Sequence, residues 1–164
     1  MEKVLPHSLF TDHDIYLFRE GKHYKLYDKF GSHNAEVNGE KGVYFAVWAP
    51  FAKKVSVIGD FNNWNPETHH LFPRWDSSGI WEGFIPHLKW GDIYKYGIRS
   101  NKDILLEKGD PFALSWEQNV QASSVISTTW YEWSDENWLA ERWKSNSLDA
   151  PISVYEMHLA SWMR

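Results

Sequence analysis

The chain begins with a short helical pattern. Thr11 and Asp14 have the three-residue spacing of a capping box, in which each side chain hydrogen-bonds the backbone N–H of the other residue. Gly21 is placed to end the helix. A second short turn is expected over residues 22–30, so residues 1–31 are predicted to form a helical appendage that docks on the main fold.

Between residues 42 and 129 apolar and polar positions alternate with a period of two, the pattern of strands with one buried face. Segments rich in Asp, Asn, Gly and Pro separate these runs. Many short strands joined by turns, with no helical pattern between them, predict an all-β fold: an immunoglobulin-like antiparallel β-sandwich over residues 32–129. The predicted strands cover residues 43–48, 55–59, 80–85, 93–99 and 123–128.

The helical pattern returns after the sandwich, in a linker over residues 130–150 with Ser134 as the expected N-cap. Residues 151–164 then alternate again and predict a strand. This strand has no partner in the sandwich pattern, so we expect it to begin a further domain that the chain does not contain.

Charge and composition narrow the class of ligand. Seventeen Lys and Arg against 22 Asp and Glu give a net charge of -5, which excludes a chain-wide basic field for nucleic acid or an anionic membrane and favours a neutral ligand. The sequence has no Cys, no signal-peptide pattern at its start and no apolar run of the ~20 residues that cross a bilayer, so we expect a cytoplasmic protein. Its 11 Trp residues suit core packing and also the flat faces of sugar rings.

Motifs for catalysis and for cofactor binding are missing from the sequence. It contains no GxSxG, GxGxxG or P-loop motif and no Cys nucleophile. His69 and His70 are adjacent, but no third and fourth ligands accompany them at the spacing of a metal site. We therefore expect no metal, no cofactor and no catalytic activity from this chain.

Several motifs carry a resemblance to a known family. The run GVYFAVWAPFAKKVSVIGDFNNWNP, followed by GIWEGFIP, YKYGI and KGDPFA, resembles the family-48 carbohydrate-binding module that precedes catalytic domains of the α-amylase superfamily. LYDKFGSH and the final ISVYEMHLASWMR resemble two segments of bacterial glycogen branching enzymes. The segment that matches ISVYEMHLASWMR typically reads YEVHLGSW in those enzymes. Ala160 departs from that pattern, because it stands where the family usually has Gly.

The resemblance implies a parent enzyme that cleaves α-1,4-linked glucan by a retaining mechanism and transfers the released chain to a 6-hydroxyl, making an α-1,6 branch. Residues 151–164 are then the first strand of its (β/α)8 barrel, and the partners of the module are α-1,4-glucan or glycogen and that barrel. Glu156 and His158 share one face of the strand, but the catalytic Asp and Glu of such enzymes come from later strands. We therefore assign no catalytic residue here.

The candidate binding site centres on the GDFNNWNP segment. Its Gly, Asn and Pro residues turn the chain, so Trp64 is presented at a loop tip where its indole can stack on a glucose ring. The amides of Asn62, Asn63 and Asn65 are close enough in sequence to hydrogen-bond sugar hydroxyls. The alternative is that Trp64 folds under its own loop as an apolar plug.

Lys95 is the second site candidate. Tyr94, Tyr96 and Ile98 share one face of the predicted strand, so Lys95 lies on the other, beside Gly97, which leaves room for a close neighbour. In the modules that this segment resembles, the matching Lys hydrogen-bonds glucan. The alternative is a solvated Lys on a strand face.

Those modules also stack sugar on a second Trp after the following turn, where this sequence has the non-aromatic segment 101–105. The absence leaves open a module that binds no sugar and serves as a structural spacer on the barrel. A debranching parent of the isoamylase type, or a trehalose-releasing relative, is a further alternative. Of the other Trp residues, packing is expected for Trp48, Trp81, Trp138 and Trp143, whereas Trp75 and Trp90 lie beside turns where they could extend a surface groove.

Overall fold

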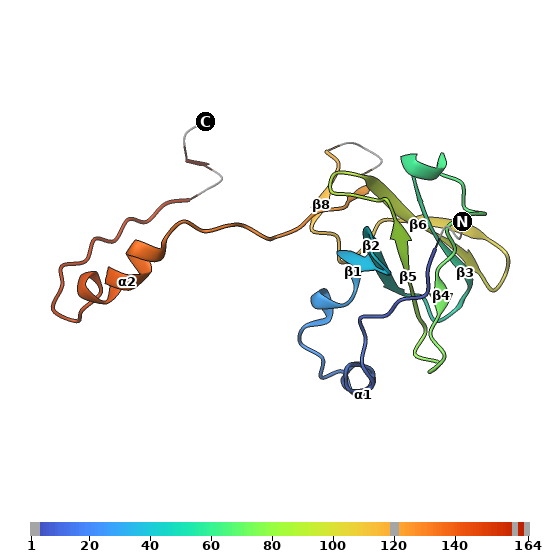
Figure 1. The fold of residues 1–164 in the computed structure, drawn as a ribbon, viewed down its shortest axis with the longest axis horizontal. Helices are drawn as coiled ribbons and strands as arrows, with labels where there is room; N and C mark the ends of the chain where they lie inside the picture. Colours follow the sequence, from blue (N-terminus) through green and yellow to red (C-terminus); the bar gives the residue numbers. More distant parts are fainter. Residues whose placement is uncertain (1–3, 119–121, 159–160, 163–164) are drawn as a thin grey trace. The chain divides into compact units, whose positions relative to one another are not determined.

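The computed structural model describes residues 4–118, 122–158 and 161–162 (Figure 1). The chain divides into two compact units, Met1–Thr129 and Trp130–Arg164. The two units are described separately below.

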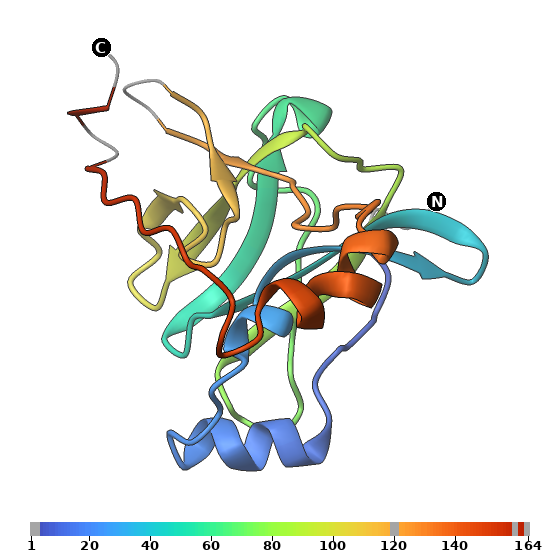
Figure 2. The same cartoon turned by 90° about the vertical axis from the view of Figure 1, so that its left-hand side faces the viewer.

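The first unit holds two antiparallel sheets, which confirms the all-β sandwich (Figures 1 and 2). One sheet has the strand order β1-β2-β5-β4 and the other β3-β6-β9-β8, with β7 paired to β6. The elements are α1 (Asp12–Arg19), η1 (Leu26–Asp28), β1 (Gly31–Val37), β2 (Glu40–Trp48), β3 (Ala52–Gly59), η2 (Asp60–Asn62), β4 (Phe72–Pro73), β5 (Ile80–Pro86), β6 (Ile93–Ser100), β7 (Leu105–Lys108), β8 (Ser115–Trp116) and β9 (Ser124–Val125).

Strand β2 is buried on both faces, because each face packs against a different part of the chain. Val43 and Phe45 point into the core between the two sheets, where the Phe45 ring lies 5.0 Å from that of Tyr94. Tyr44 on the opposite face belongs to a second cluster with Phe10 and Phe30. The N-terminal segment therefore covers the outer face of this sheet.

The start of α1 has the predicted capping box. Thr11 N donates to Asp14 Oδ2 at 2.8 Å, and Asp14 N donates to Thr11 Oγ1 at 3.2 Å. Burial opposes ionisation of Asp14, but the hydrogen bonds from Thr11, His23 and Lys29 outweigh it and lower the pKa of this carboxyl. The carboxylate thereby anchors the first turn of the helix.

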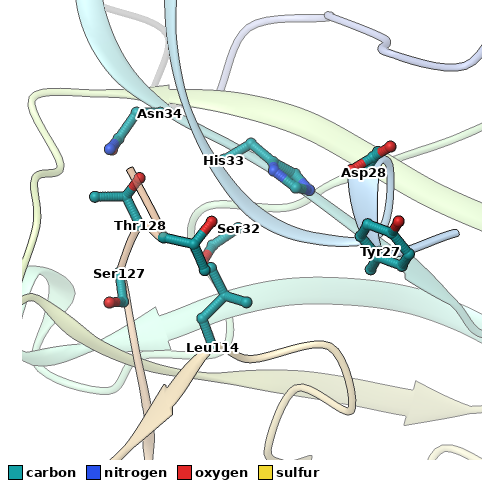
Figure 3. A pocket seen from close by; sticks show the side chains of 9 residues that line it. Tyr27, Asp28, Ser32, His33, Asn34, Leu114, Ser127 and Thr128 are labelled. Atoms are coloured by element: carbon teal, nitrogen blue, oxygen red, sulfur yellow. The ribbon is translucent and has the colours of Figure 1, made fainter. Parts of the chain in front are cut away.

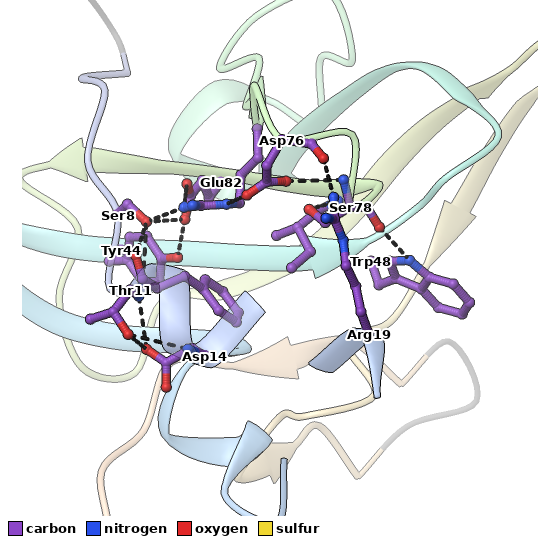
Figure 4. A network of polar contacts seen from close by, with 12 residues as sticks. Ser8, Thr11, Asp14, Arg19, Tyr44, Trp48, Asp76, Ser78 and Glu82 are labelled. Carbon is purple, nitrogen blue, oxygen red and sulfur yellow. Dashed lines mark hydrogen bonds and ion pairs between the residues drawn. The ribbon is translucent and has the colours of Figure 1, made fainter. Parts of the chain in front are cut away.

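A polar network fixes the N-terminal segment to the sheet (Figure 4). The buried Glu82 carboxylate accepts from the Tyr44 hydroxyl at 2.6 Å and from Ser8 Oγ at 2.9 Å, and it pairs with Arg74 Nη1 at 2.7 Å. Arg74 Nε also pairs with Asp76 Oδ2 at 2.8 Å. Because every one of these groups has an opposite charge or a hydrogen-bond partner, burial of the carboxylate is tolerated.

Asp110 is the most buried carboxyl group of the sandwich, at 0% exposure. Its Oδ2 accepts from the Tyr94 hydroxyl at 2.6 Å and from the Tyr96 hydroxyl at 3.1 Å, and its Oδ1 accepts from Phe112 N at 2.8 Å. Its own N–H donates to Ser124 Oγ at 2.8 Å. The side chain and backbone N–H of this one residue thus hold β6, β9 and the turn after β7 together.

Some elements differ from the prediction. β1 was not anticipated because its side chains are mostly polar, as expected of an edge strand with one unpaired side. The strand predicted over 123–128 is only Ser124–Val125. Trp48, expected to be packed, is 57% exposed, although its Nε1 donates to the Ser78 carbonyl oxygen at 3.0 Å and its ring contacts Phe18.

The second unit contains α2 (Glu136–Ser145), where a helix was predicted. The prediction of Ser134 as N-cap is wrong: Asp135 occupies that position and makes no capping side-chain hydrogen bond. Trp138 and Trp143 on this helix are exposed. Residues 151–158 form no strand, and within the described part of the chain no other strand pairs with them. Residues 159–160 and 163–164 of the predicted strand lie outside the described residues.

Removing the Asp110 carboxylate should destabilise the sandwich strongly. Asp110→Ala leaves two tyrosine hydroxyls and the Phe112 N–H without their partner in a dry environment. We expect a loss of about 2–5 kcal/mol in the free energy of unfolding, measured by urea denaturation. Asp103→Asn, which removes only the charge of an exposed pair with Lys53 and suits the φ of 61° at this position, is the control and should change little. Equal effects of the two variants would contradict the assigned role.

The same residue should make stability depend on pH. Burial raises the pKa of Asp110 above that of the unfolded chain, ~3.9, so the folded state holds the proton more tightly. This contribution to stability is fully present below the unfolded pKa and is lost as pH rises through the folded pKa. Asp110→Asn cannot titrate, so the stability of the wild type relative to this variant should fall with rising pH. Urea unfolding across the acidic range tests this, and a relative stability that rises would contradict it.

Candidate carbohydrate-binding site

The candidate site is built on the loop between β3 and β4, which folds back over the outer face of the second sheet. Val57 N donates to the His69 carbonyl oxygen at 3.0 Å, and Leu71 N donates to that of Val55 at 2.9 Å. Ser56 and His70 form an isolated bridge. The end of the loop is therefore held along the edge of β3, and its tip, from η2 onward, lies over the neighbouring strand β6.

Trp64 stands at a sharply turned position of this loop. Asn63 and Trp64 have φ of 53° and 57°, two consecutive left-handed residues that are not glycine. Such conformations cost of order 1–3 kcal/mol each and persist where surrounding contacts impose them. Here Trp64 N donates to the Gly59 carbonyl oxygen at 2.9 Å, and the indole Nε1 donates to Asp60 Oδ1 at 2.8 Å. The ring is partly exposed and its orientation is fixed.

Lys95 lies against Trp64, although the two residues come from separate motifs. Its Nζ sits over the indole, 5.9 Å from the ring centroid, within the range of a cation–π contact. Tyr94 and Tyr96 are fully buried on the core side of β6, which confirms that Lys95 projects from the opposite face. The ammonium group thus supplies donors beside an aromatic surface.

Pro66 of the loop lies over Gly97 of β6. A Cβ at this position would lie 3.4 Å from Pro66 Cβ, an ordinary contact distance, and 2.7 Å from Ser56 Oγ on β3, so a side chain here would displace the Ser56 hydroxyl. Glu67 of the loop also forms an ion pair with Arg99 of β6. The contact at Pro66 and this ion pair together hold the loop that carries Trp64 close to Lys95.

The three Asn residues have different environments. Asn62 is engaged within the loop: its Oδ1 accepts from Gly59 N at 3.1 Å, and its Nδ2 donates to the Val57 carbonyl oxygen at 3.0 Å. Asn65 Oδ1 accepts from Glu67 N at 2.9 Å. Asn63 is exposed at the tip. Of the predicted set, Trp64 and Lys95 are placed together, Asn63 borders them in sequence, and Asn62 serves as scaffold.

The charges around the site balance, since Asp60 and Lys95 both contact the indole of Trp64 and Glu67 pairs with Arg99. A balanced polar rim around an aromatic ring suits an uncharged, hydroxyl-rich ligand better than an anion. The segment expected to lack a second aromatic forms a turn held by the Lys53–Asp103 pair at 2.6 Å. Leu105 beyond it pairs with Arg99, so it lies on the same sheet face as the site.

The sequence did not single out Asp60, Glu67 or Arg99. The contact of Asp60 with the indole depends on the left-handed conformations of Asn63 and Trp64, which no local pattern indicates. The Glu67–Arg99 pair joins residues 32 apart, and no local pattern indicates it.

Only some of the other Trp residues are packed or exposed as predicted. Trp81 is buried at 9% exposure, and its Nε1 donates to the Ala49 carbonyl oxygen at 3.0 Å, which confirms its packing role. Trp75 and Trp90 are both exposed.

Among the described residues no group of three or more His, Cys, Asp and Glu side chains is placed to hold a metal ion. No helix in that part of the chain has the length and apolar character of a membrane span.

Comparison with known proteins identifies the family. Residues 29–113 match the family model described as carbohydrate-binding module 48 (isoamylase N-terminal domain). Three similar proteins are named 1,4-alpha-glucan branching enzyme GlgB. That of Trichormus variabilis is 48% identical over 93% of this chain and 20% of its own length, that of Aromatoleum aromaticum 47% over 100% and 25%, and that of Aquifex aeolicus 46% over 96% and 25%.

This chain therefore spans only a fifth to a quarter of the length of these relatives. Among solved structures, pullulanase of Klebsiella pneumoniae matches 60% of this chain and 10% of its own at 26% identity, with a TM-score of 0.46 that is too low to support an argument. The family model alone covers more than half of the 164 residues, from the start of the sandwich to the turn after β7. The chain belongs to the carbohydrate-binding module 48 family.

Proposed function

We propose that this chain is the glucan-binding and glucan-orienting module of a glycogen branching enzyme. The whole enzyme would cleave α-1,4-glucan and transfer the released chain to form α-1,6 branches, in the cytoplasm. Residues 151–164 would supply the first strand of its catalytic barrel, and the module would pack on that barrel. Similarity to proteins named as branching enzymes, over nearly the whole chain, supports this parent.

One observation carries the binding role: the indole of Trp64 is held in a fixed orientation, by Asp60 at its Nε1 and by Lys95 over its ring. A ring fixed before the ligand arrives loses little side-chain entropy on binding. It offers apolar contact to the C–H face of a glucose ring, and Lys95 donates to the hydroxyls at its edge.

The strength of this site can be bounded. An aromatic stacking platform contributes ~1–3 kcal/mol, with base stacking as the measured analogue. A millimolar dissociation constant requires about 4 kcal/mol. Trp64 alone falls short of that, so Lys95 and further contacts must add to it, and we expect binding in the weak range.

The second candidate function is a structural spacer that binds no sugar. It is favoured by the absence of an aromatic residue over residues 101–105 and by the partial burial of Trp64. A debranching parent of the isoamylase type is supported by the family description, which names isoamylase. The similarity of the whole chain to branching enzymes favours the first parent.

Substitution of two Trp residues separates the binding and spacer functions. Trp64→Ala should weaken binding of maltoheptaose or β-cyclodextrin by ~1–3 kcal/mol, because it removes the stacking surface, while the melting temperature changes little. Trp81→Ala should instead cost about 3–5 kcal/mol of fold stability, because it empties a packed site. Calorimetric titration and thermal melting of both variants measure these effects. If Trp64→Ala melts the module and leaves sugar affinity unchanged, Trp64 is a structural plug and not the binding surface. If the unsubstituted module binds neither sugar, the spacer function is correct.

The isolated 164-residue chain should neither branch nor hydrolyse amylose. Retaining glycoside chemistry needs two carboxyl groups about 5–5.5 Å apart across the scissile bond, and the resemblance assigns both to later barrel strands. An iodine-stain assay with stoichiometric chain checks this, with a complete branching enzyme as positive control. A change in the absorbance of the amylose–iodine complex would show that the chain carries its own active site.

A further inference from the structure

A second, polar groove runs along the edge strand β1, away from Trp64. Two cavities of about 430 Å³ and about 440 Å³ adjoin here, and both are lined by Asn34. Figure 3 shows the first of them, with Asn34 and Thr128 on one side and Tyr27 and Asp28 on the other. Neither cavity shares a lining residue with the loop that carries Trp64.

The walls of the groove come from both sheets. Ser32 and Asn34 alternate with His33 along β1, so they project from the same face of the strand as Glu36. They pair with Phe45 and Val43, whose side chains enter the core, and thus face the gap between the sheets at its open edge. Residues 127–129, which follow β9 of the other sheet, form the opposite wall.

Each of the two cavities has one exposed aromatic ring in its lining. Tyr27 lines the first cavity and is 58% exposed, and Trp90 lines the second and is 69% exposed. Neither belongs to the two buried clusters of the sandwich. A ring that contributes so little to the core is available to stack on a ligand.

The polar groups between the two rings carry no net charge. Asp28 and Glu36 are offset by Lys41 and Lys89, and the remaining polar lining consists of hydroxyl, amide and imidazole groups. Such a lining both donates and accepts hydrogen bonds, which matches a neutral polyhydroxylated chain better than a phosphate or a cationic peptide.

The length of the groove indicates a chain and not a single sugar. Ser32 to Glu36 spans about 13 Å at the rise of a β-strand, which exceeds one hexose ring. The LYDKFGSH segment, which the site at Trp64 does not use, supplies Tyr27, Asp28, Ser32 and His33 to the lining. His33 is held in place by the contact of its Nε2 with the Phe30 carbonyl oxygen at 2.9 Å.

We propose that this groove between Tyr27 and Trp90 is a second binding site for a linear α-1,4-glucan. The choice of glucan rests on the proposed function, and the groove deepens it by giving the module two separate contacts with the polymer. The site takes several consecutive glucose units, with an aromatic platform at either end and hydroxyl-binding side chains between.

The test uses the whole 164-residue chain carrying Trp64→Ala, so that the first site is removed. Maltoheptaose should still shift the backbone amide NMR signals of residues 32–36 and 127–129. Adding Tyr27→Ala or Trp90→Ala should weaken this residual binding about 5- to 150-fold, the equivalent of one lost stacking platform. Trp75→Ala, another exposed Trp outside the groove, is the matched control and should leave the affinity unchanged.

The outcomes distinguish the two sites. Loss of all binding in Trp64→Ala alone overturns the groove and leaves the proposed function standing. Unchanged binding in Trp64→Ala, abolished by Trp90→Ala, supports the groove and removes the first site. Equal residual affinity in the Tyr27, Trp90 and Trp75 variants overturns the groove. Equal affinity for maltose and maltoheptaose overturns its continuity. Thermal melting verifies that each variant is folded.

Discussion

The buried carboxylate of Asp110 is the interaction on which the arrangement of the sandwich depends. A carboxyl group without water must find hydrogen-bond donors, and here two tyrosine hydroxyls and one backbone N–H converge on it. The Tyr96 hydroxyl also lies 3.3 Å from the Ala46 carbonyl oxygen of the opposite sheet. The requirement to satisfy one polar group therefore fixes the separation of the two sheets.

The same constraint reaches the N-terminal segment. The turn held by Asp110 places Phe112, whose ring stacks on that of Phe30 at 5.2 Å. Phe30 immediately precedes β1, and Gly31 has a φ of 96°, which strains any side chain, while a Cβ there would lie 3.2 Å from Phe112 Cβ. The KGDPFA segment thus contacts both walls of the groove along β1: Phe112 packs on Phe30 before β1, and Asp110 N donates to Ser124 Oγ of β9.

The sequence predicted those parts of the fold in which the local pattern and the tertiary environment agree. β2, β3, β5 and β6 alternate because one face enters a shared core, and the capping box of α1 is complete within three residues. β1 was missed because its side chains at the sheet edge are mostly polar, and β7 because its four residues are all exposed and do not alternate. Trp48 was expected to pack because it belongs to an alternating run. Alternation distinguishes the two faces of a strand, but it does not show whether the face that carries Trp48 is covered by another part of the chain.

For the candidate site, the sequence indicated which residues are candidates for sugar binding, but not which of them contact one another and which only support the loop. Trp64 and Lys95 come from separate motifs, and the structure places the ammonium over the indole. The scaffold role of Asn62 and the Glu67–Arg99 pair depend on how the loop folds over β6, which no spacing encodes. Long-range polar contacts were the part beyond the reach of the sequence.

A polymer ligand changes what a weak site can do. Each aromatic platform of the two proposed sites would contribute only part of the free energy that a millimolar complex requires. A glucan chain that occupies one site, however, raises the effective concentration of its neighbouring glucose units at any second site that it can reach, and the combined affinity exceeds either alone without any new contact. The two proposed sites, shallow and of balanced charge, would therefore suit a module that holds a long neutral chain and still releases it. A single deep pocket would bind a chain end tightly but could not orient an extended strand across the surface.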